Sequence, residues 1–235
     1  MFGLKAIVYV LAAVTPAIIL LIYVYRHDKV EKEPTGLLIR LLVQGVLSAL
    51  FSISLEEFGE RVLGLFFYED TAWYWILFAF LVVAVAEEGT KFLLMKRMTW
   101  RNPNFNFRFD GIIYAVFVSL GFAAFENIGY VFGYGLSVAP SRALLSIPGH
   151  MAFAVYMGYY YGRARWYENY GYKEEANNSL WASFLSAVFY HGFYDACAML
   201  GTTLSMIVFF IFVAITYYRA FRTIRKESQM DAPII

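Results

Sequence analysis

Charged residues are scarce in this chain, and the few that it has nearly balance one another. Only 16% of the 235 residues are Asp, Glu, Lys or Arg, and the formal net charge is +1 at pH 7. A nucleic-acid-binding protein needs a larger basic surface, so this composition argues against that class. The chain also has one cysteine, Cys197, which excludes an internal disulfide.

Hydrophobic residues dominate the composition instead. They make up 60% of the chain, aromatic residues make up 20%, and the mean hydropathy is +0.56. Soluble globular proteins are far less apolar. The composition therefore predicts an integral membrane protein.

Several apolar stretches are long enough to cross about 30 Å of hydrocarbon as helices. No linker or internal repeat divides them, so we expect one domain, residues 1–235, with an all-α fold: a polytopic membrane bundle of about seven transmembrane helices. The expected spans are 4–25, 35–55, 72–95, 111–134, 140–162, 179–200 and 202–221.

Basic residues indicate how this bundle is oriented. Fourteen of the 19 Lys and Arg residues fall on one side if the N-terminus is outside. Positive charge concentrates on the cytoplasmic side of membrane proteins, so we expect the N-terminus outside and the C-terminus inside. Small-residue pairs, Gly129 with Gly133 and Gly158 with Gly162, are expected to allow close helix packing.

Ionisable groups within the expected spans are the most informative feature. A charged side chain at the centre of a membrane helix costs about 2.5 to 3.5 kcal/mol, and packing alone does not explain seven polar groups at such positions. These groups are Glu87, Glu88, Lys91, Glu126, His150, His191 and Asp195.

Their spacing shows how they can cooperate. Lys91 lies three and four residues after the two glutamates of "AEEGTKFLL", so its ammonium can reach either carboxylate. His191 and Asp195 are also four residues apart, so the carboxylate can orient the imidazole. We therefore expect four helices to meet at one buried polar centre.

A proline and a glycine precede one of these histidines. Pro148 and Gly149 predict a kink just before His150. Such a kink either turns His150 toward a cavity or serves packing alone, and the two interpretations stay equally weighted.

The ordered series Glu87-Glu88-x-x-Lys91, Phe122-x-x-x-Glu126, His150 and His191-x-x-x-Asp195 resembles the PrsW family of bacterial intramembrane proteases. These are relatives of the type II CAAX prenyl proteases, and the resemblance covers residues 87–195. It implies a multi-pass enzyme of the bacterial cytoplasmic membrane. The implied activity is first-site cleavage of a single-span, anti-sigma-factor-like substrate during envelope stress.

A second acidic pair lies earlier in the chain. "LEEFGER" contains Glu56-Glu57-x-x-x-Arg61, which resembles the first motif as CAAX proteases write it. It lies at the outer end of the second span and lacks a following histidine at the usual distance. We interpret it as a solvated interfacial segment.

Peptide hydrolysis needs a base, an oxyanion donor and an acid, and the buried groups can supply all three. We expect Glu87 with His191 to deprotonate water, Asp195 to orient His191, and His150 to be an oxyanion donor or a further ligand. Glu88 and Glu126 complete the centre, one of them protonated at neutral pH. Lys91 supports the motif electrostatically.

Metal dependence is open on the sequence. No cofactor is required by the pattern, and no H-E-x-x-H helix is present. Glu126, His150 and His191 nevertheless form a set of two nitrogens and one oxygen that suits a catalytic zinc ion.

Two other functions compete with proteolysis. A proton-coupled transporter would use the Glu, His and Asp residues as an intramembrane relay. A non-catalytic scaffold would use them to specify helix packing. The absence of visible inverted repeats disfavours the transporter, and the intact polar series disfavours the scaffold.

Overall fold

The computed structural model describes residues 2–234, and these form helices without any β-strand. The longer helices are α1 (Phe2–His27), α2 (Thr35–Gly64), α4 (Val85–Thr99), α5 (Asp110–Tyr134), α7 (Ile147–Asn169), α8 (Lys173–Leu200) and α9 (Thr203–Gln229). Shorter elements precede two of them. They are α3 (Ala72–Leu77) and η1 (Phe78–Ala84) before α4, and η2 (Leu136–Val138), α6 (Ala139–Ser141) and η3 (Arg142–Ser146) before α7.

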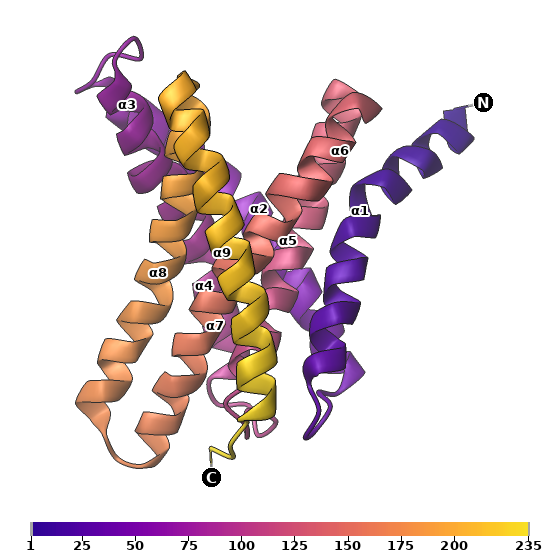
Figure 1. Cartoon of the computed structure of the whole chain (residues 1–235), viewed down its shortest axis with the longest axis vertical. Helices are drawn as coiled ribbons and strands as arrows, with labels where there is room; N and C mark the ends of the chain where they lie inside the picture. Colours follow the sequence, from indigo (N-terminus) through magenta and orange to yellow (C-terminus); the bar gives the residue numbers. More distant parts are fainter. Residues whose placement is uncertain (1, 235) are drawn as a thin grey trace.

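These elements form the expected all-α membrane bundle, with one long helical segment for each expected span (Figure 1). Four helices, α1, α2, α5 and α9, are long and apolar enough to cross a membrane on composition alone. The remaining segments carry Glu87, Glu88, Lys91, His150, His191 and Asp195. Polar residues lower the hydropathy of α7 and α8, and α4 has only 15 residues, so length and composition do not mark these helices.

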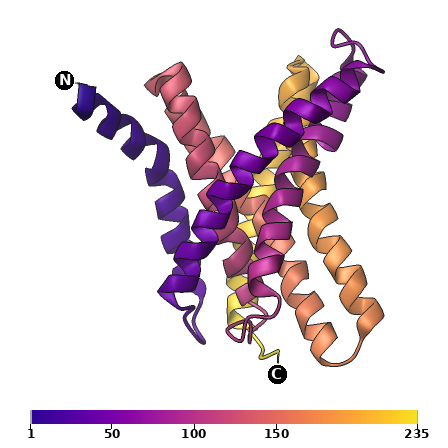
Figure 2. The same ribbon diagram turned by 180° about the vertical axis from the view of Figure 1, so that it is seen from behind.

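The two ends of the described chain lie at opposite ends of the bundle (Figures 1 and 2). An odd number of spans requires this arrangement. The connections 28–34, 100–109 and 170–172 gather at the end where the chain finishes (Figure 2). The basic residues that we expect on the cytoplasmic side flank these same connections. We therefore still predict that this end of the bundle faces the cytoplasm and that the N-terminus lies outside.

Helix α5 forms the centre of the core and packs closely on two neighbours. A Cβ atom on Gly111 would lie 2.6 Å from the Gly158 carbonyl oxygen of α7, and one on Gly45 of α2 would lie 2.7 Å from the Phe122 nitrogen. The packing role expected for Gly158 and Gly162 is thus confirmed. The same expectation is wrong for Gly129 and Gly133, because no neighbouring helix lies within 4 Å of a Cβ atom placed on either residue.

Acidic side chains are buried at the C-terminal end of the bundle. Asp28 is 1% exposed, and neither of its carboxylate oxygens has a hydrogen-bond partner among the described residues. The nearby Glu33 accepts a hydrogen bond from the Tyr114 hydroxyl at 2.9 Å. Burial raises the pKa of Asp28 to about 6 and that of Glu33 to about 7.

We expect this pair to make stability depend on pH. A carboxyl group whose pKa is higher in the folded state favours folding when protonated, and this contribution is lost as pH rises through 6 and 7. The double variant Asp28→Asn/Glu33→Gln should therefore have a free energy of unfolding about 1–2 kcal/mol higher than wild type at pH 8, after allowance for solvent screening. At pH 4.5 the two proteins should be almost equally stable. Thermal unfolding in detergent across this range measures the gap. A gap that does not change with pH contradicts the prediction.

Candidate active site

Helix α4 contributes Glu87, Glu88 and Lys91, and the lysine side chain contacts both glutamates. Lys91 Nζ donates to Glu87 Oε2 at 3.0 Å and to Glu88 Oε1 at 2.8 Å. The ammonium also lies 3.7 Å from the centre of the Phe122 ring, a favourable cation–π position. Glu87, Glu88 and Lys91 are 5%, 0% and 1% exposed, so the three charges form a buried unit. The contacts expected from their spacing are present.

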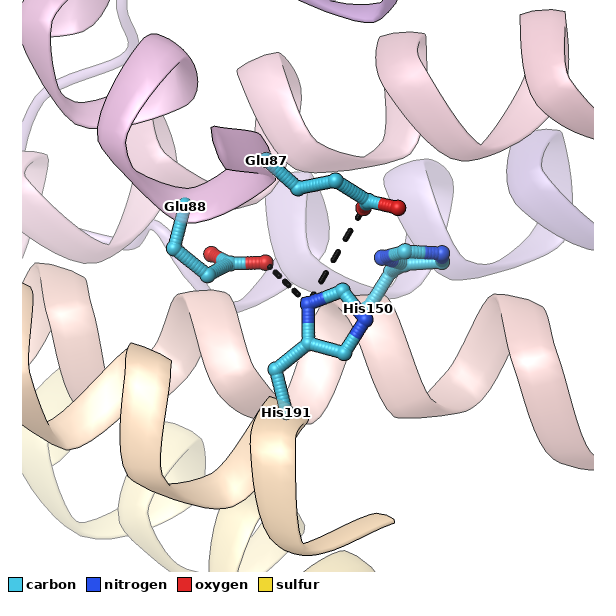
Figure 3. Close-up of side chains that lie close together, drawn as sticks. All are labelled: Glu87, Glu88, His150 and His191. Atoms are coloured by element: carbon cyan, nitrogen blue, oxygen red, sulfur yellow. Dashed lines mark hydrogen bonds and ion pairs between the residues drawn. The ribbon is translucent and has the colours of Figure 1, made fainter. Parts of the chain in front are cut away.

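Helix α8 places His191 against this unit. Its Nδ1 lies 2.9 Å from Glu88 Oε1 and 3.9 Å from Glu87 Oε2, as Figure 3 shows. Its Nε2 lies 3.2 Å from Asp195 Oδ2 on the next turn. The Phe153 ring stacks on the imidazole with centroids 5.1 Å apart. Carboxylates at both ring nitrogens and an aromatic face fix the orientation of His191.

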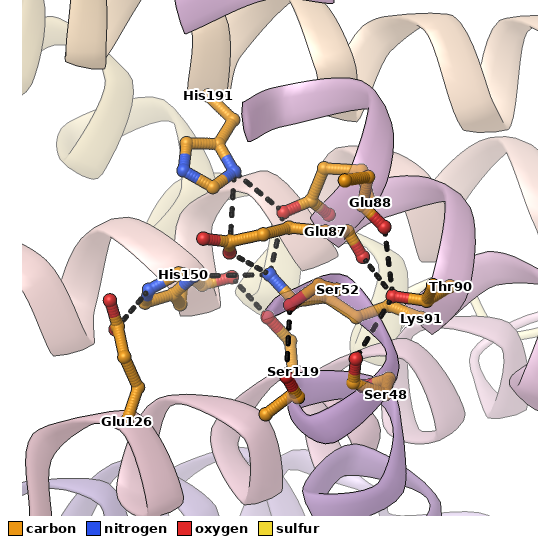
Figure 4. A network of polar contacts seen from close by, with 12 residues as sticks. Ser48, Ser52, Glu87, Glu88, Thr90, Lys91, Ser119, Glu126, His150 and His191 are labelled. Atoms are coloured by element: carbon orange, nitrogen blue, oxygen red, sulfur yellow. Dashed lines mark hydrogen bonds and ion pairs between the residues drawn. The ribbon is translucent and has the colours of Figure 1, made fainter. Parts of the chain in front are cut away.

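Helix α7 places His150 between Lys91 and Glu126. His150 Nδ1 lies 3.3 Å from Lys91 Nζ, and Nε2 lies 3.2 Å from Glu126 Oε2 (Figure 4). Because an ammonium can only donate, Nδ1 accepts and the ring proton sits on Nε2, which donates to Glu126. His150 is therefore a neutral imidazole with one donor. Ser119 Oγ donates to the His150 carbonyl at 2.9 Å and ties α5 to this turn.

Glu126 has a second partner that the sequence analysis missed. Arg142 Nη2 donates to Glu126 Oε2 at 2.6 Å, and Arg142 Nε donates to Asn127 Oδ1 at 2.7 Å. Glu88 thus contacts Lys91, which it shares with Glu87, and Glu126 contacts Arg142, and these cations disfavour the expected protonation of Glu88 or Glu126. The spacing was a usable signal, because Arg142 precedes His150 by eight residues, or about two turns of one helical segment.

Backbone irregularities precede both motif segments. The π-helical turn η1 ends just before α4, and the π-helical turn η3 ends just before α7. Such turns are frequent at functional sites because they change the rotation of the residues that follow. Pro148 lies in the first turn of α7, so the expected kink takes the form of a π-helical turn in a continuous helical segment.

A polar cavity of about 300 Å³ lies among these residues. Glu87, Glu126, His150, His191 and Asp195 all line it, together with Arg142 and Glu56. Glu88 and Lys91 do not line it and lie behind Glu87. We call this cavity the reaction chamber. Of the two α4 glutamates, Glu87 alone faces it.

Glu56 belongs to the chamber, which corrects the interpretation of "LEEFGER" as a solvated segment. Helix α2 continues nine residues beyond the expected span, to Gly64. Ser48, Ser52 and Glu56 follow one another at four-residue spacing, so they share one face of α2. Thr90 Oγ1 contacts the Ser48 carbonyl at 3.3 Å, which turns this face toward α4. The next glutamate, Glu57, is exposed.

Four of the site residues fit a metal ion. One donor atom from each of Glu87, Glu88, His150 and His191 lies within 4.8 Å of the others. Two imidazoles and two carboxylates suit zinc. Glu88 Oε2 is buried without a hydrogen-bond partner among the described residues. This oxygen is therefore available as a metal ligand. This set contains Glu87 and Glu88 in place of Glu126, which instead binds Arg142.

Comparisons with known proteins identify the family of this chain. A sequence profile described as "PrsW family intramembrane metalloprotease" matches residues 33–218. "Protease PrsW" of Geobacillus kaustophilus is 35% identical over 184 residues, which cover 78% of this chain and 76% of that protein. "Protease PrsW" of Halalkalibacterium halodurans is 30% identical over 222 residues, covering 94% and 97%.

"Protease PrsW" of Bacillus subtilis is 32% identical over 154 residues, which cover 66% of this chain and 67% of that protein. No solved structure matches the chain. The bacterial relatives and the apolar helices show that this protein is an integral membrane peptidase of a bacterial membrane. A peptidase of this kind acts on membrane proteins. The chain belongs to the PrsW family of intramembrane metalloproteases.

Proposed function

We propose that this protein cleaves a single-span membrane protein inside the bundle, with water activated by Glu87. The observation that carries the proposal is the meeting of Glu87, Glu88, His150 and His191, from three helices, in a buried site. The substrate class that fits the family resemblance is an anti-sigma factor cut at its first site. We treat residues 1–235 as one protease domain, with 87–195 as its motif core.

Each catalytic role that we propose is supported by the position of its residue in the chamber. Glu87 is the base because it faces the chamber. It takes one proton from water while the water oxygen attacks the carbonyl carbon. The Arg142 guanidinium favours the oxyanion that forms, because its Nη1 is not used in the contacts with Glu126 and Asn127. When the C–N bond breaks, the proton that Glu87 took passes to the leaving amine, either directly or by way of His191.

The remaining residues position these groups. Glu88 contacts His191 and Lys91 from outside the chamber. Asp195 contacts the other nitrogen of His191. Glu126 fixes the proton of His150 on Nε2 and holds Arg142 in place.

A metal ion would be held by Glu87, Glu88, His150 and His191. When bound, it would lower the pKa of a coordinated water and polarise the peptide carbonyl. Elemental analysis of the purified protein tests this assignment. We expect about one zinc per chain in wild type and a clear loss in His150→Ala, whereas equal metal content in both contradicts the ligand set.

Reconstitution in liposomes tests the proposed function. We expect wild type to cut a candidate single-span anti-sigma factor into a new fragment, and Glu87→Gln to leave it intact because the amide cannot take a proton. Gel analysis and mass spectrometry identify the fragment. Proton or ion flux without any fragment supports the transporter, and neither result supports the scaffold.

A further inference from the structure

A groove between α2 and α5 opens into the reaction chamber. It has a volume of about 430 Å³ and shares Glu56, Glu87, Glu126 and Tyr130 with the chamber. Its other walls are mainly apolar side chains of α2 and α5. Gly129 lines it, and the lack of a side chain there leaves space on the α5 wall. Glu56 and Glu87 line both spaces, so a peptide that fills this groove and reaches Glu87 also lies beside Glu56.

Glu56 is the unpaired carboxylate of the chamber. Glu87 pairs with Lys91, Glu126 pairs with Arg142, and Asp195 pairs with His191. Among the described residues, Glu56 has no Lys, Arg or His nitrogen within 4.0 Å. Arg142, the one Lys or Arg side chain among the residues that line the chamber, is already engaged by Glu126. A half-buried charge without a partner is costly, so a cationic ligand would be favoured at this position.

The opposite wall of the groove also suits a cation. Tyr130 and Tyr134 lie on α5 with stacked rings 5.7 Å apart, and both line the groove with Glu56. The guanidinium of Arg142 already lies 3.7 Å from the Tyr130 ring centre. Tyr134 is 70% exposed and has no cation on its ring among the described residues. Aromatic faces attract Lys and Arg side chains.

We propose that Glu56 is a specificity subsite, which binds a Lys or Arg side chain of the substrate close to the scissile bond, with Tyr134 at its entrance. This inference rests on the proposed protease function and adds the substrate feature that the groove recognises. The ammonium or guanidinium supplies the cation that Glu56 lacks. The apolar groove walls contact the rest of the peptide.

A library of single-span reporters with a randomised segment at the outer membrane face tests the subsite. Wild-type protein in liposomes cuts the library, and mass spectrometry maps each cut. We expect Lys and Arg to be enriched about tenfold at one fixed position relative to the cut, the preference that a single charge-assisted contact can supply. Glu56→Gln should lose this enrichment, and Glu56→Lys should shift it toward Asp and Glu.

Glu57→Gln is the matched control, because Glu57 is the exposed neighbour of Glu56. It should keep the wild-type enrichment. For one reporter with Lys at that position, Glu56→Gln should raise KM and leave kcat nearly unchanged, which loss of folding would not do. Cleavage by wild type without Lys or Arg enrichment, or enrichment that survives in Glu56→Gln, overturns the subsite alone. No cleavage by wild type overturns the protease function and the subsite together.

Discussion

Replacing His191 by alanine is expected to lower the cleavage rate by about 10²–10⁴-fold, the contribution typical of an acid–base residue. His191 is the group through which α8 reaches both α4 glutamates, at 2.9 Å from Glu88 and 3.9 Å from Glu87. Its loss also leaves Asp195 without its 3.2 Å partner. The measurement is the initial rate of fragment formation in liposomes at pH 7, per folded molecule.

Ser186→Ala is the matched control for this variant. Ser186 lies on α8 and donates within its own helix to the Ser183 carbonyl at 3.2 Å. It does not line the chamber. The control should cleave at the wild-type rate and unfold at the same temperature. A His191→Ala protein that keeps a rate within threefold of wild type removes His191 from the mechanism.

Contacts within one helix could be predicted from the sequence, whereas contacts between helices could not. Lys91 with Glu87 and Glu88, and His191 with Asp195, were predictable because the 3.6-residue period fixes neighbours three and four positions apart. The contacts of His191 with Glu88 and of His150 with Lys91 depend on how each helix is rotated in the bundle. Two π-helical turns precede α4 and α7 and set that rotation; Pro148 indicated an irregularity near the second, and no sequence signal marked the first.

The residues that sequence reasoning missed lie near the ends of apolar stretches. Glu56 was interpreted as part of a solvated segment, and Arg142, at the start of the expected span 140–162, was given no role. Hydrogen bonding along a helix does not stop where hydrophobicity stops, so α2 continues to Gly64 and carries Glu56 inward in register with Ser52. Charges near a span end are therefore better judged by the helical face they share with buried polar residues.

Replacing Lys91 by methionine is expected to destabilise the protein by about 3–5 kcal/mol, the usual cost of removing one partner from a buried ion pair. The ammonium is the cation nearest to two carboxylates that are 5% and 0% exposed. Methionine keeps the length of the side chain and its packing on Phe122, so the loss is electrostatic. Thermal or denaturant unfolding in detergent, followed by tryptophan fluorescence, measures the change.

Lys96→Met on the same helix is the matched control, because Lys96 makes no ion pair among the described residues. Its loss should cost less than about 1 kcal/mol.

Adding Glu88→Gln to Lys91→Met should recover part of the lost stability, since one of the two uncompensated charges is then gone. Recovery of folding without recovery of cleavage would assign Glu88 to positioning His191, because a glutamine can fill the space of Glu88 and not its charge. Unchanged stability in Lys91→Met would mean that Glu87 and Glu88 do not depend on the lysine, and the electrostatic account of this motif would then be wrong.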